Sequence, residues 1–187
     1  MKSSFYSEAE LKKLGLKAFG KNVLISRKCS LYGADKMTLG HDVRIDDFCI
    51  LSGHITIGNY VHIAAYSALY AGHAGIEIQD FCGVSSRGTI YSAIDDFSGA
   101  FMISPMVPPE LTNLTCGKVV LKRFTQLGCG TVVFPQSILN EGVATGAFTL
   151  VKGEIPAWSL VAGIPAKKIK DRQKGILELV KKIEERE

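Results

Sequence analysis

The sequence of 187 residues has no apolar run near the roughly eighteen residues that a membrane-spanning helix needs. Its first residues, MKSSFYSEAELKK, lack the apolar core of a signal peptide, so we expect a protein that is not exported. The five cysteines are odd in number and form no CxxC pair, which favours reduced thiols and a cytoplasmic location. The net charge of +4 is too small to predict nucleic-acid binding.

What the sequence does contain is a six-residue repeat of aliphatic side chains. The repeat begins with an outlying pair, changes phase once in the middle, and resumes after a long interruption. Of its 17 positions, 16 are Ile, Leu or Val, a periodicity typical of stacked repeats. The positions are Ile25, Leu31, Leu39, Ile45, Leu51, Ile57, Ile63, Leu69, Ile78, Val84, Ile90, Leu121, Leu127, Val133, Leu139, Thr145 and Val151.

The fourth residue after each aliphatic is nearly always small or β-branched, and Gly, Asn or Asp lies between the two. Gly58-Asn59 and Asn140-Glu141-Gly142 are examples of these intervening residues. Such residues tolerate the left-handed backbone conformation that a tight corner requires. The pattern therefore predicts short strands joined by turns and stacked into a solenoid of parallel β rungs.

The chain resembles the hexapeptide-repeat acyltransferases over roughly residues 20–170. Its segment 139–156, LNEGVATGAFTLVKGEIP, is similar to the last coils of that family. Segment 158–170, WSLVAGIPAKKIK, resembles the exit motif of the acetyl-CoA-dependent sugar branch. The resemblance implies an all-β fold, a left-handed parallel β-helix with three hexads per triangular coil.

Three segments lie outside the regular coils. A capping box, Ser7 with Glu10, predicts an N-terminal cap helix within residues 1–20. Residues 21–170 form the expected β-helix domain, interrupted by a loop over 95–118 that has no hexads. Residues 171–187 are predicted as a C-terminal helix that packs its apolar stripe of Ile176, Leu179, Val180 and Ile183 on the coil or on a neighbouring subunit.

The four histidines do not predict a metal site. A zinc hydratase of the same fold would need three converging His ligands, two of them close together in one segment. His41, His54 and His62 instead fall at corners or hexad ends, where exposed turn residues are expected. His73 differs because it lies where the hexad phase breaks, between Gly72 and Gly75, so its imidazole is expected on the outside of the coil.

The resemblance places the family's catalytic histidine just after the rung that ends here in Ile94-Asp95-Asp96, where this chain has no histidine. A sugar hydroxyl needs a general base to attack a thioester, whereas an amine is nucleophilic once it loses one proton. The paired acids Asp95 and Asp96, with His73 nearby, therefore favour N-acylation. An Asp-Asp turn that only caps the loop is the structural alternative.

The Asp-Asp-Phe-Ser-Gly segment before a Pro-rich loop resembles O-antigen sugar enzymes of this family. These include N-acetyltransferases that act on nucleotide-linked 4-amino-4,6-dideoxy sugars. The resemblance makes Arg87 and Tyr91 candidates for substrate binding, although a surface role explains Arg87 equally well.

In members of this family, the pantetheine of acetyl-CoA lies in a groove between neighbouring coils, beside backbone amides and small side chains. Lysine side chains suit phosphate recognition. When the family's cofactor-binding positions are matched residue by residue to this sequence, they give eight candidates. These are Gly128, Cys129, Ala147, Lys152, Gly153, Lys167, Lys168 and Lys170.

The sequence thus predicts a homotrimer, as the resemblance implies, that moves acetyl from acetyl-CoA to the amine of a nucleotide-linked amino sugar for O-antigen or other surface polysaccharide. Its expected partners are the nucleotide sugar and its own copies, with no nucleic acid, membrane span or metal. Two alternatives remain. One is a sugar O-acetyltransferase with His73 as base, and the other is a non-catalytic β-helix scaffold.

Overall fold

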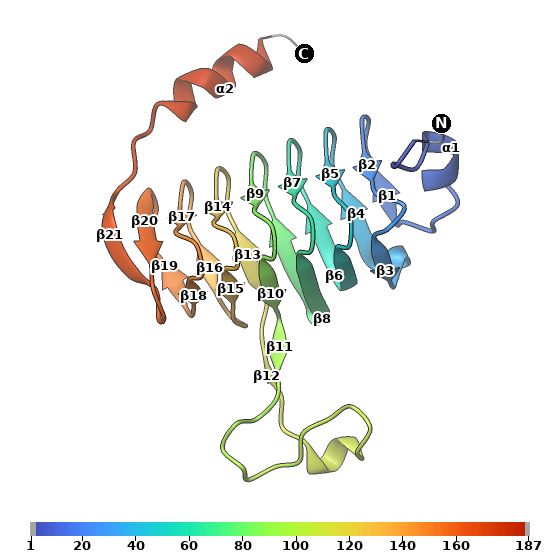
Figure 1. Ribbon diagram of the computed structural model, residues 1–187, viewed down its shortest axis with the longest axis vertical. Helices are drawn as coiled ribbons and strands as arrows, with labels where there is room; N and C mark the ends of the chain where they lie inside the picture. The colour runs from blue at the N-terminus through green and yellow to red at the C-terminus, as the bar shows by residue number, and fades with distance from the viewer. Residues whose placement is uncertain (1–2, 186–187) are drawn as a thin grey trace.

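The computed structural model describes residues 3–185 and shows a parallel β-solenoid with a helix at each end (Figure 1). The predicted boundaries at residues 1 and 187 lie outside the described residues. One face of the coil holds seven parallel strands, one from each coil, in the order β2-β5-β7-β9-β14-β17-β20. These are β2 (Leu24–Ile25), β5 (Arg44–Ile45), β7 (His62–Ile63), β9 (Gly83–Val84), β14 (Gln126–Leu127), β17 (Ala144–Thr145) and β20 (Ser159–Ala162).

The other two faces are joined into one sheet because two long strands run around a corner of the coil. Those strands are β6 (Ile50–Ile57) and β8 (Ala68–Ile78), which pair with each other in parallel. The remaining strands are β1 (Ala18–Phe19), β3 (Ser30–Tyr32), β4 (Met37–Leu39), β10 (Thr89–Tyr91), β13 (Val119–Leu121), β15 (Val132–Val133), β16 (Ile138–Leu139), β18 (Leu150–Val151) and β19 (Glu154–Ile155).

The hexad aliphatics form the core of the coil, as predicted. All 17 repeat positions except Leu31 are buried, and Leu31 is half-buried against the same cluster. The residue four positions later also points inward in most coils, as in Val43, Ser67 and Thr131. Burial of one large and one small residue per hexad provides the main favourable term for the fold, because each rung stacks its apolar side chains on the next.

Close approach of the backbone at one corner explains the small residues found there. A Cβ on Gly40 would lie 2.6 Å from the backbone of Gly58 and 2.4 Å from Asn59 Oδ1. The same corner is held by an amide and a carboxylate side chain, because the His41 N–H donates to Asn59 Oδ1 at 2.8 Å. The Asn59 N–H in turn donates to Asp80 Oδ1 at 2.7 Å. The corner residues therefore fix the stacking of successive coils.

The N-terminal cap is present but shorter than the predicted segment. Helix α1 covers only Glu8–Leu11, with the predicted capping box between Ser7 and Glu10. The coil itself begins before residue 21, because β1 already pairs with β4 at Ala18 and Phe19. The Glu10 carboxylate also accepts two hydrogen bonds from the Arg27 guanidinium, at 2.8 and 2.7 Å, which ties the cap to the first coil.

This tie predicts a pH-dependent cap. Hydrogen bonds from Arg27, and then from Ser7, lower the pKa of Glu10 from 4.5 to about 2. A lowered pKa stabilises the folded cap above about pH 4.5, and the stabilisation is lost as the pH falls toward about 2. Glu10→Gln should therefore reduce amide-exchange protection around residues 5–27 at pH 7 and have a shrinking effect below pH 4.5. Glu110→Gln, on the projecting loop, is the control, and a Glu10→Gln effect independent of pH would contradict this account.

The C-terminal segment differs from the predicted continuous helix. Strand β21 (Lys167–Asp171) turns back and pairs antiparallel with β20, and helix α2 covers only Ile176–Glu184. Within α2, Val180 is buried against Phe124 and Trp158, with Ile176 and Leu177 beside it. Leu179 was expected on the buried stripe but is 57% exposed, because the helix turns Leu177 toward the coil instead.

The predicted interruption projects from the coil on a two-stranded stalk (Figure 1). Strand β11 (Ala93–Ile94) pairs antiparallel with β12 (Thr115–Cys116), and the 3₁₀ turn η2 (Pro109–Leu111) lies in the loop between them. A second 3₁₀ turn, η1 (Ala34–Lys36), lies before β4. The stalk joins the coil at Ser92, whose carbonyl accepts the Gly117 N–H at 2.9 Å.

Candidate active site

A column of small residues runs along the outer side of the seven-strand face. In five successive coils it is the residue directly after the buried residue of that face. Parallel register aligns these positions from coil to coil. The coils approach closely here, because a Cβ on Gly128 would lie 2.6 Å from the Gly146 backbone. The column, called the small-residue channel below, consists of Ala64, Ser85, Gly128, Gly146 and Ala162. None of the five positions carries a long side chain.

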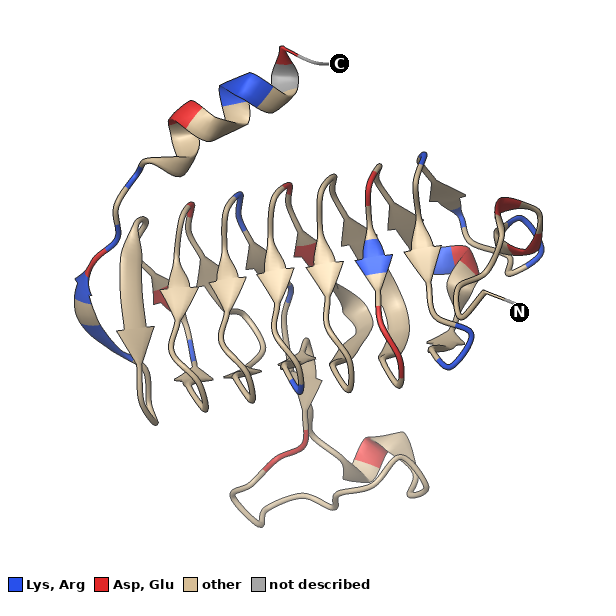
Figure 2. Cartoon of the chain, turned by 45° about the horizontal axis from the view of Figure 1, so that its top comes forward, with Lys and Arg blue, Asp and Glu red and all other residues tan. Residues whose placement is uncertain are grey.

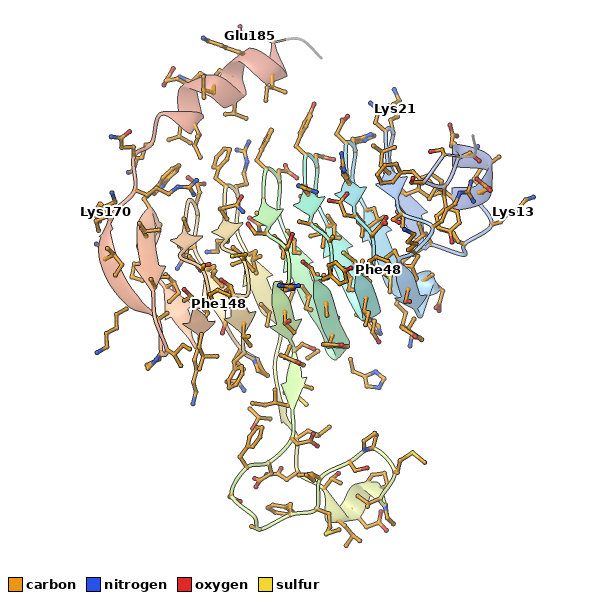
Figure 3. All side chains as sticks on the ribbon, in the orientation of Figure 1. Lys13, Lys21, Phe48, Phe148, Lys170 and Glu185 are labelled. Atoms are coloured by element: carbon orange, nitrogen blue, oxygen red, sulfur yellow. The ribbon has the colours of Figure 1, made fainter. Side chains whose placement is uncertain are left out.

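One end of the small-residue channel meets a basic strand. Because β21 pairs with β20, Lys167 lies opposite Ala162, and Lys168 lies opposite Val161. Lys170 lies opposite Leu160, and all three lysines are exposed. Figure 2 shows this strand as the basic edge of the coil, and Figure 3 places Lys170 there. One of the charges is partly balanced, because Lys168 Nζ lies 2.6 Å from Asp171 Oδ1.

The other end of the channel opens into a cavity of about 390 Å³. Its polar lining includes His62, Ser85, Ser86 and Gln126. The Gln126 amide donates to Ser85 Oγ at 3.0 Å, which fixes the hydroxyl toward the cavity wall. The cavity and the channel are therefore continuous through Ser85.

His62 is held at the cavity by a carboxylate from the preceding coil. Its Nε2 lies 2.8 Å from Asp46 Oδ2, and Arg44 Nε donates to Asp46 Oδ1 at 2.7 Å. Burial raises the pKa of Asp46, but the hydrogen bonds from Arg44 and His62 outweigh it, so the pKa lies below its ordinary value. The hexad pattern predicts only an exposed turn position for His62. The contact joins residues 16 apart, and it becomes visible only once the strand register is known.

The predicted cofactor residues divide between this face and others. Gly128 lies in the small-residue channel, Cys129 is exposed beside it, and Ala147 is exposed at the next turn. Lys167, Lys168 and Lys170 lie at the channel end, as described above. Lys152 and Gly153 follow β18, which belongs to the other sheet, so within one chain the structure does not bring them to the channel.

The two predicted catalytic acids differ in what they contact. Asp96 Oδ1 accepts the N–H of Ser98 at 2.7 Å and also its hydroxyl, and Asp96 Oδ2 lies 3.4 Å from Asn113 Nδ2. These contacts, Ser98 first, lower the pKa of Asp96 and give it a role in shaping the loop. Within residues 3–185, no hydrogen bond or ion pair engages the exposed Asp95 carboxylate. Asp95 is thus the acid that remains open to a ligand.

The remaining predicted site residues lie apart from the channel. His73 is exposed as expected, with its ring centroid 6.2 Å from that of His54. The Arg87 guanidinium lies over the Tyr66 ring at 5.9 Å. Tyr91 stacks on Tyr70 at 5.2 Å, and burial raises its pKa.

Two further features bear on the possible chemistry. Within the described residues, no group of three or more His, Cys, Asp and Glu side chains is placed to hold a metal ion. None of the helices in that part of the chain has the length and apolarity needed to cross a membrane.

The cavity and the acidic loop lie on opposite sides of one chain. Ser85 follows β9, whereas Asp95 follows β11 on the stalk, and Figure 1 shows the two strands on opposite edges of the coil. A ligand that touches both in a single chain would have to cross the coil.

Comparison with known proteins places this geometry in an enzymatic context. The chain is 44% identical to dTDP-4-amino-4,6-dideoxy-D-glucose acyltransferase of Escherichia coli over 94% of its own length and 93% of that protein. It is 31% identical to the putative lipopolysaccharide biosynthesis O-acetyl transferase WbbJ of Escherichia coli strain K12, over 75% and 71% of the two chains. A scan of protein-family profiles finds no match.

Among solved structures, the chain resembles AntD, an N-acyltransferase from Bacillus cereus. A serine-to-cysteine variant of AntD, bound to dTDP-4-amino-4,6-dideoxyglucose and coenzyme A, has 47% identity and a TM-score of 0.98 over the whole of both chains. Another AntD structure holds dTDP and 3-hydroxybutyryl-CoA, with 48% identity, 98% coverage of each chain and a TM-score of 0.96.

Proposed function

Because this chain belongs to the hexapeptide-repeat β-helix acyltransferases, we propose that it acylates the 4-amino group of a dTDP-linked 4-amino-4,6-dideoxyglucose. Within that family it is an acyl-CoA-dependent sugar N-acyltransferase. The observation that carries the proposal is the small-residue channel, which runs from the basic strand β21 to the cavity at Ser85. Coenzyme A has the matching order of parts, with phosphates at one end and the thioester at the other. Membership of this enzyme family also removes the non-catalytic scaffold from the alternatives.

Pantetheine is proposed to lie in the channel, with its phosphates near Lys167, Lys168 and Lys170. Lysine ammonium groups bind phosphate oxygens as point charges. The thioester carbonyl then reaches the cavity beside Ser85, where a hydroxyl or a backbone N–H stabilises the tetrahedral oxygen.

The carboxylate that accepts the proton of the sugar ammonium is proposed to be Asp95. AntD has been studied as variants of a serine and an aspartate that are ten residues apart in its sequence. In this chain Ser85 and Asp95 have that separation, and so do Ser86 and Asp96. The geometry favours the first pair, because Ser85 lies in the channel and Asp96 is held by Ser98 and Asn113.

The proposed reaction needs a proton acceptor, and it forms a C–N bond while it breaks the C–S bond of the thioester. Asp95 accepts a proton from the sugar ammonium, and the freed amine lone pair attacks the thioester carbon. The tetrahedral intermediate then expels CoA thiolate as the C–S bond breaks. The proton lost from the attacking nitrogen balances the thiolate charge, and an amide remains on the sugar.

A homotrimer, the assembly that the sequence resemblance implies, is proposed to complete this site, because Ser85 and Asp95 of one chain lie on opposite sides of its coil. The projecting loop carries exposed apolar side chains with no partner inside the described chain, such as Phe97 at 85% and Met106 at 89% exposure. Residues 95–117 contain three acids and no Lys or Arg. Such a loop suits docking on a neighbouring copy, where Asp95 would approach that copy's Ser85 cavity.

The acyl group is proposed to be acetyl, and the product is proposed to serve O-antigen or other surface polysaccharide. The sequence resemblance of the exit motif supports acetyl, whereas AntD holds a 3-hydroxybutyryl donor. The 31% identity to a lipopolysaccharide-biosynthesis protein supports the polysaccharide role.

Donor choice can be tested directly. With dTDP-4-amino-4,6-dideoxyglucose as acceptor, we expect thiol release from acetyl-CoA with a kcat/KM at least about tenfold above that with 3-hydroxybutyryl-CoA, a discrimination within reach of a shaped pocket. The reverse order would contradict the acetyl assignment while leaving N-acylation intact.

A further inference from the structure

One glutamine side chain reaches across two coils to the serine of the proposed site. Gln126 begins β14, which pairs with β9 so that Gln126 lies opposite Gly83 (Figure 1). Its amide nitrogen donates to Ser85 Oγ at 3.0 Å and to the Leu127 carbonyl at 3.1 Å. The side chain therefore lies along the wall of the cavity of about 390 Å³ and is held at both of its contacts.

The contact with the Leu127 carbonyl fixes the direction of the hydrogen bond to Ser85. A carbonyl oxygen only accepts hydrogen bonds, so the amide atom beside it has to be the nitrogen of Gln126. That same nitrogen is the atom beside Ser85 Oγ, so the serine oxygen accepts there. The Leu127 carbonyl also accepts the Ser85 N–H at 3.0 Å, and it thus holds the serine backbone and the glutamine amide in one arrangement.

Gly83 provides the space for this glutamine. A Cβ on Gly83 would lie 3.0 Å from Gln126 Cδ and 3.1 Å from its Nε2, which is closer than side-chain atoms normally pack. The φ of Gly83 is not positive, so an alanine could adopt its backbone conformation. The missing side chain therefore lets the Gln126 amide cross β9 and reach Ser85.

The hydroxyl hydrogen of Ser85 is left for a ligand. Its oxygen accepts from Gln126, and within residues 3–185 no acceptor takes the hydrogen itself. Ser85 belongs to the small-residue channel and lines the cavity. In acyl transfer, the thioester carbonyl oxygen gains most from such a donor, because it becomes negative in the tetrahedral intermediate.

The geometry points to Gln126 as a positioning residue that sets Ser85 as the hydrogen-bond donor to the tetrahedral oxygen, an inference that rests on the proposed function. A serine hydroxyl without a fixed neighbour rotates to whichever acceptor is near. A donor that is already oriented does not have to reorganise as the negative charge develops. Gln126 does not touch the reacting atoms and acts only through Ser85.

A double-mutant cycle separates this role from a structural one. The variants are Ser85→Ala, Gln126→Met, which keeps the length of the side chain without its donor, and the two together. Thiol release from acetyl-CoA with the amino sugar as acceptor gives kcat and KM. We expect kcat to fall about 10²-fold or more in Ser85→Ala and about tenfold or more in Gln126→Met, with KM near the wild-type value in both. The double variant should match Ser85→Ala, because no hydroxyl is left to orient.

Two further variants complete the test. Gly83→Ala places a methyl group where the Gln126 amide lies, so it should lower kcat as Gln126→Met does and add nothing to Ser85→Ala. Gln79→Met is the matched control, because Gln79 accepts the Arg123 N–H at 3.3 Å and so also links two coils, but it follows β8, outside the channel. It should keep the wild-type kcat. Thermal unfolding of each variant confirms that it folds.

Wild-type kcat in Gln126→Met and Gly83→Ala would overturn the inference. So would losses that multiply with the loss in Ser85→Ala, or a change confined to KM, since these indicate a structural or a binding role. Turnover by the wild-type chain separates this inference from the proposed function. If the wild type releases thiol with the amino sugar while any of these results is obtained, only the role of Gln126 fails. If the wild type releases no thiol with the amino sugar, the proposed function itself fails.

Discussion

Asp95→Asn is expected to lower kcat/KM for the amino sugar by about 10²–10⁴-fold, the range that a general base contributes. An asparagine keeps the shape of the side chain but cannot take the proton of the ammonium. Binding of dTDP and CoA should persist, because asparagine has the size of aspartate and keeps one hydrogen-bond acceptor. Stopped-flow detection of thiol release measures the rate, and calorimetry measures the binding.

Two control variants make this result specific. Asp96→Asn should reduce the rate much less, through the loss of contacts with Ser98 and Asn113 that shape the loop. His73→Asn should leave kcat near the wild-type value, because the proposed proton acceptor is Asp95. A full rate in Asp95→Asn together with a collapse of kcat in His73→Asn would contradict the account and favour His73 as the base.

Ala162→Leu is expected to weaken acyl-CoA binding by about ten- to hundredfold. Ala162 lies in the small-residue channel between Gly146 and the basic strand, where a Cβ on Gly146 would already approach it to 3.0 Å. A leucine there occupies the space proposed for pantetheine, and overpacking of a closely fitted space costs about 1–3 kcal/mol. Calorimetric titration with CoA measures the loss.

The matched control is Ala157→Leu, an exposed alanine in the turn that precedes β20. It adds the same side chain outside the channel and should leave CoA affinity unchanged. Both variants should bind dTDP normally. Wild-type affinity for CoA in Ala162→Leu would place the cofactor elsewhere on the coil.

The solenoid could be predicted from the sequence because its geometry repeats. A side chain at Ile63 meets the same environment as one at Val84 or Leu127, so one rule explains every rung. The phase break at His73 was also informative, since a residue outside the hexad register has to leave the core. Strand β21 (Lys167–Asp171) was not predictable in this way, because it pairs antiparallel with β20 and so breaks the repeat.

The proposed site depends on which face of the coil each residue occupies, and the sequence alone does not give the face of every residue. Gly128 and Lys167 share a face through strand register, whereas Lys152 was assigned by its neighbourhood in the chain and lies on another sheet. A small residue directly after the buried aliphatic, as in Ala64, Ser85 and Gly128, was a signal in the sequence that could have identified the channel. The contact between His62 and Asp46 needed the structure, because it depends on the register between two coils.

A comparison of two acceptor sugars, one with an amine at C4 and one with a hydroxyl, tests N-acylation most directly. The initial rate of thiol release from acetyl-CoA is measured with dTDP-4-amino-4,6-dideoxyglucose and with its counterpart that carries a hydroxyl at C4. The account predicts rapid release with the amine and at least about 10²-fold slower release with the hydroxyl, because Asp95 can free an amine but is a weak base for a hydroxyl. Equal rates, or faster release with the hydroxyl, would contradict N-acylation as the function of this site.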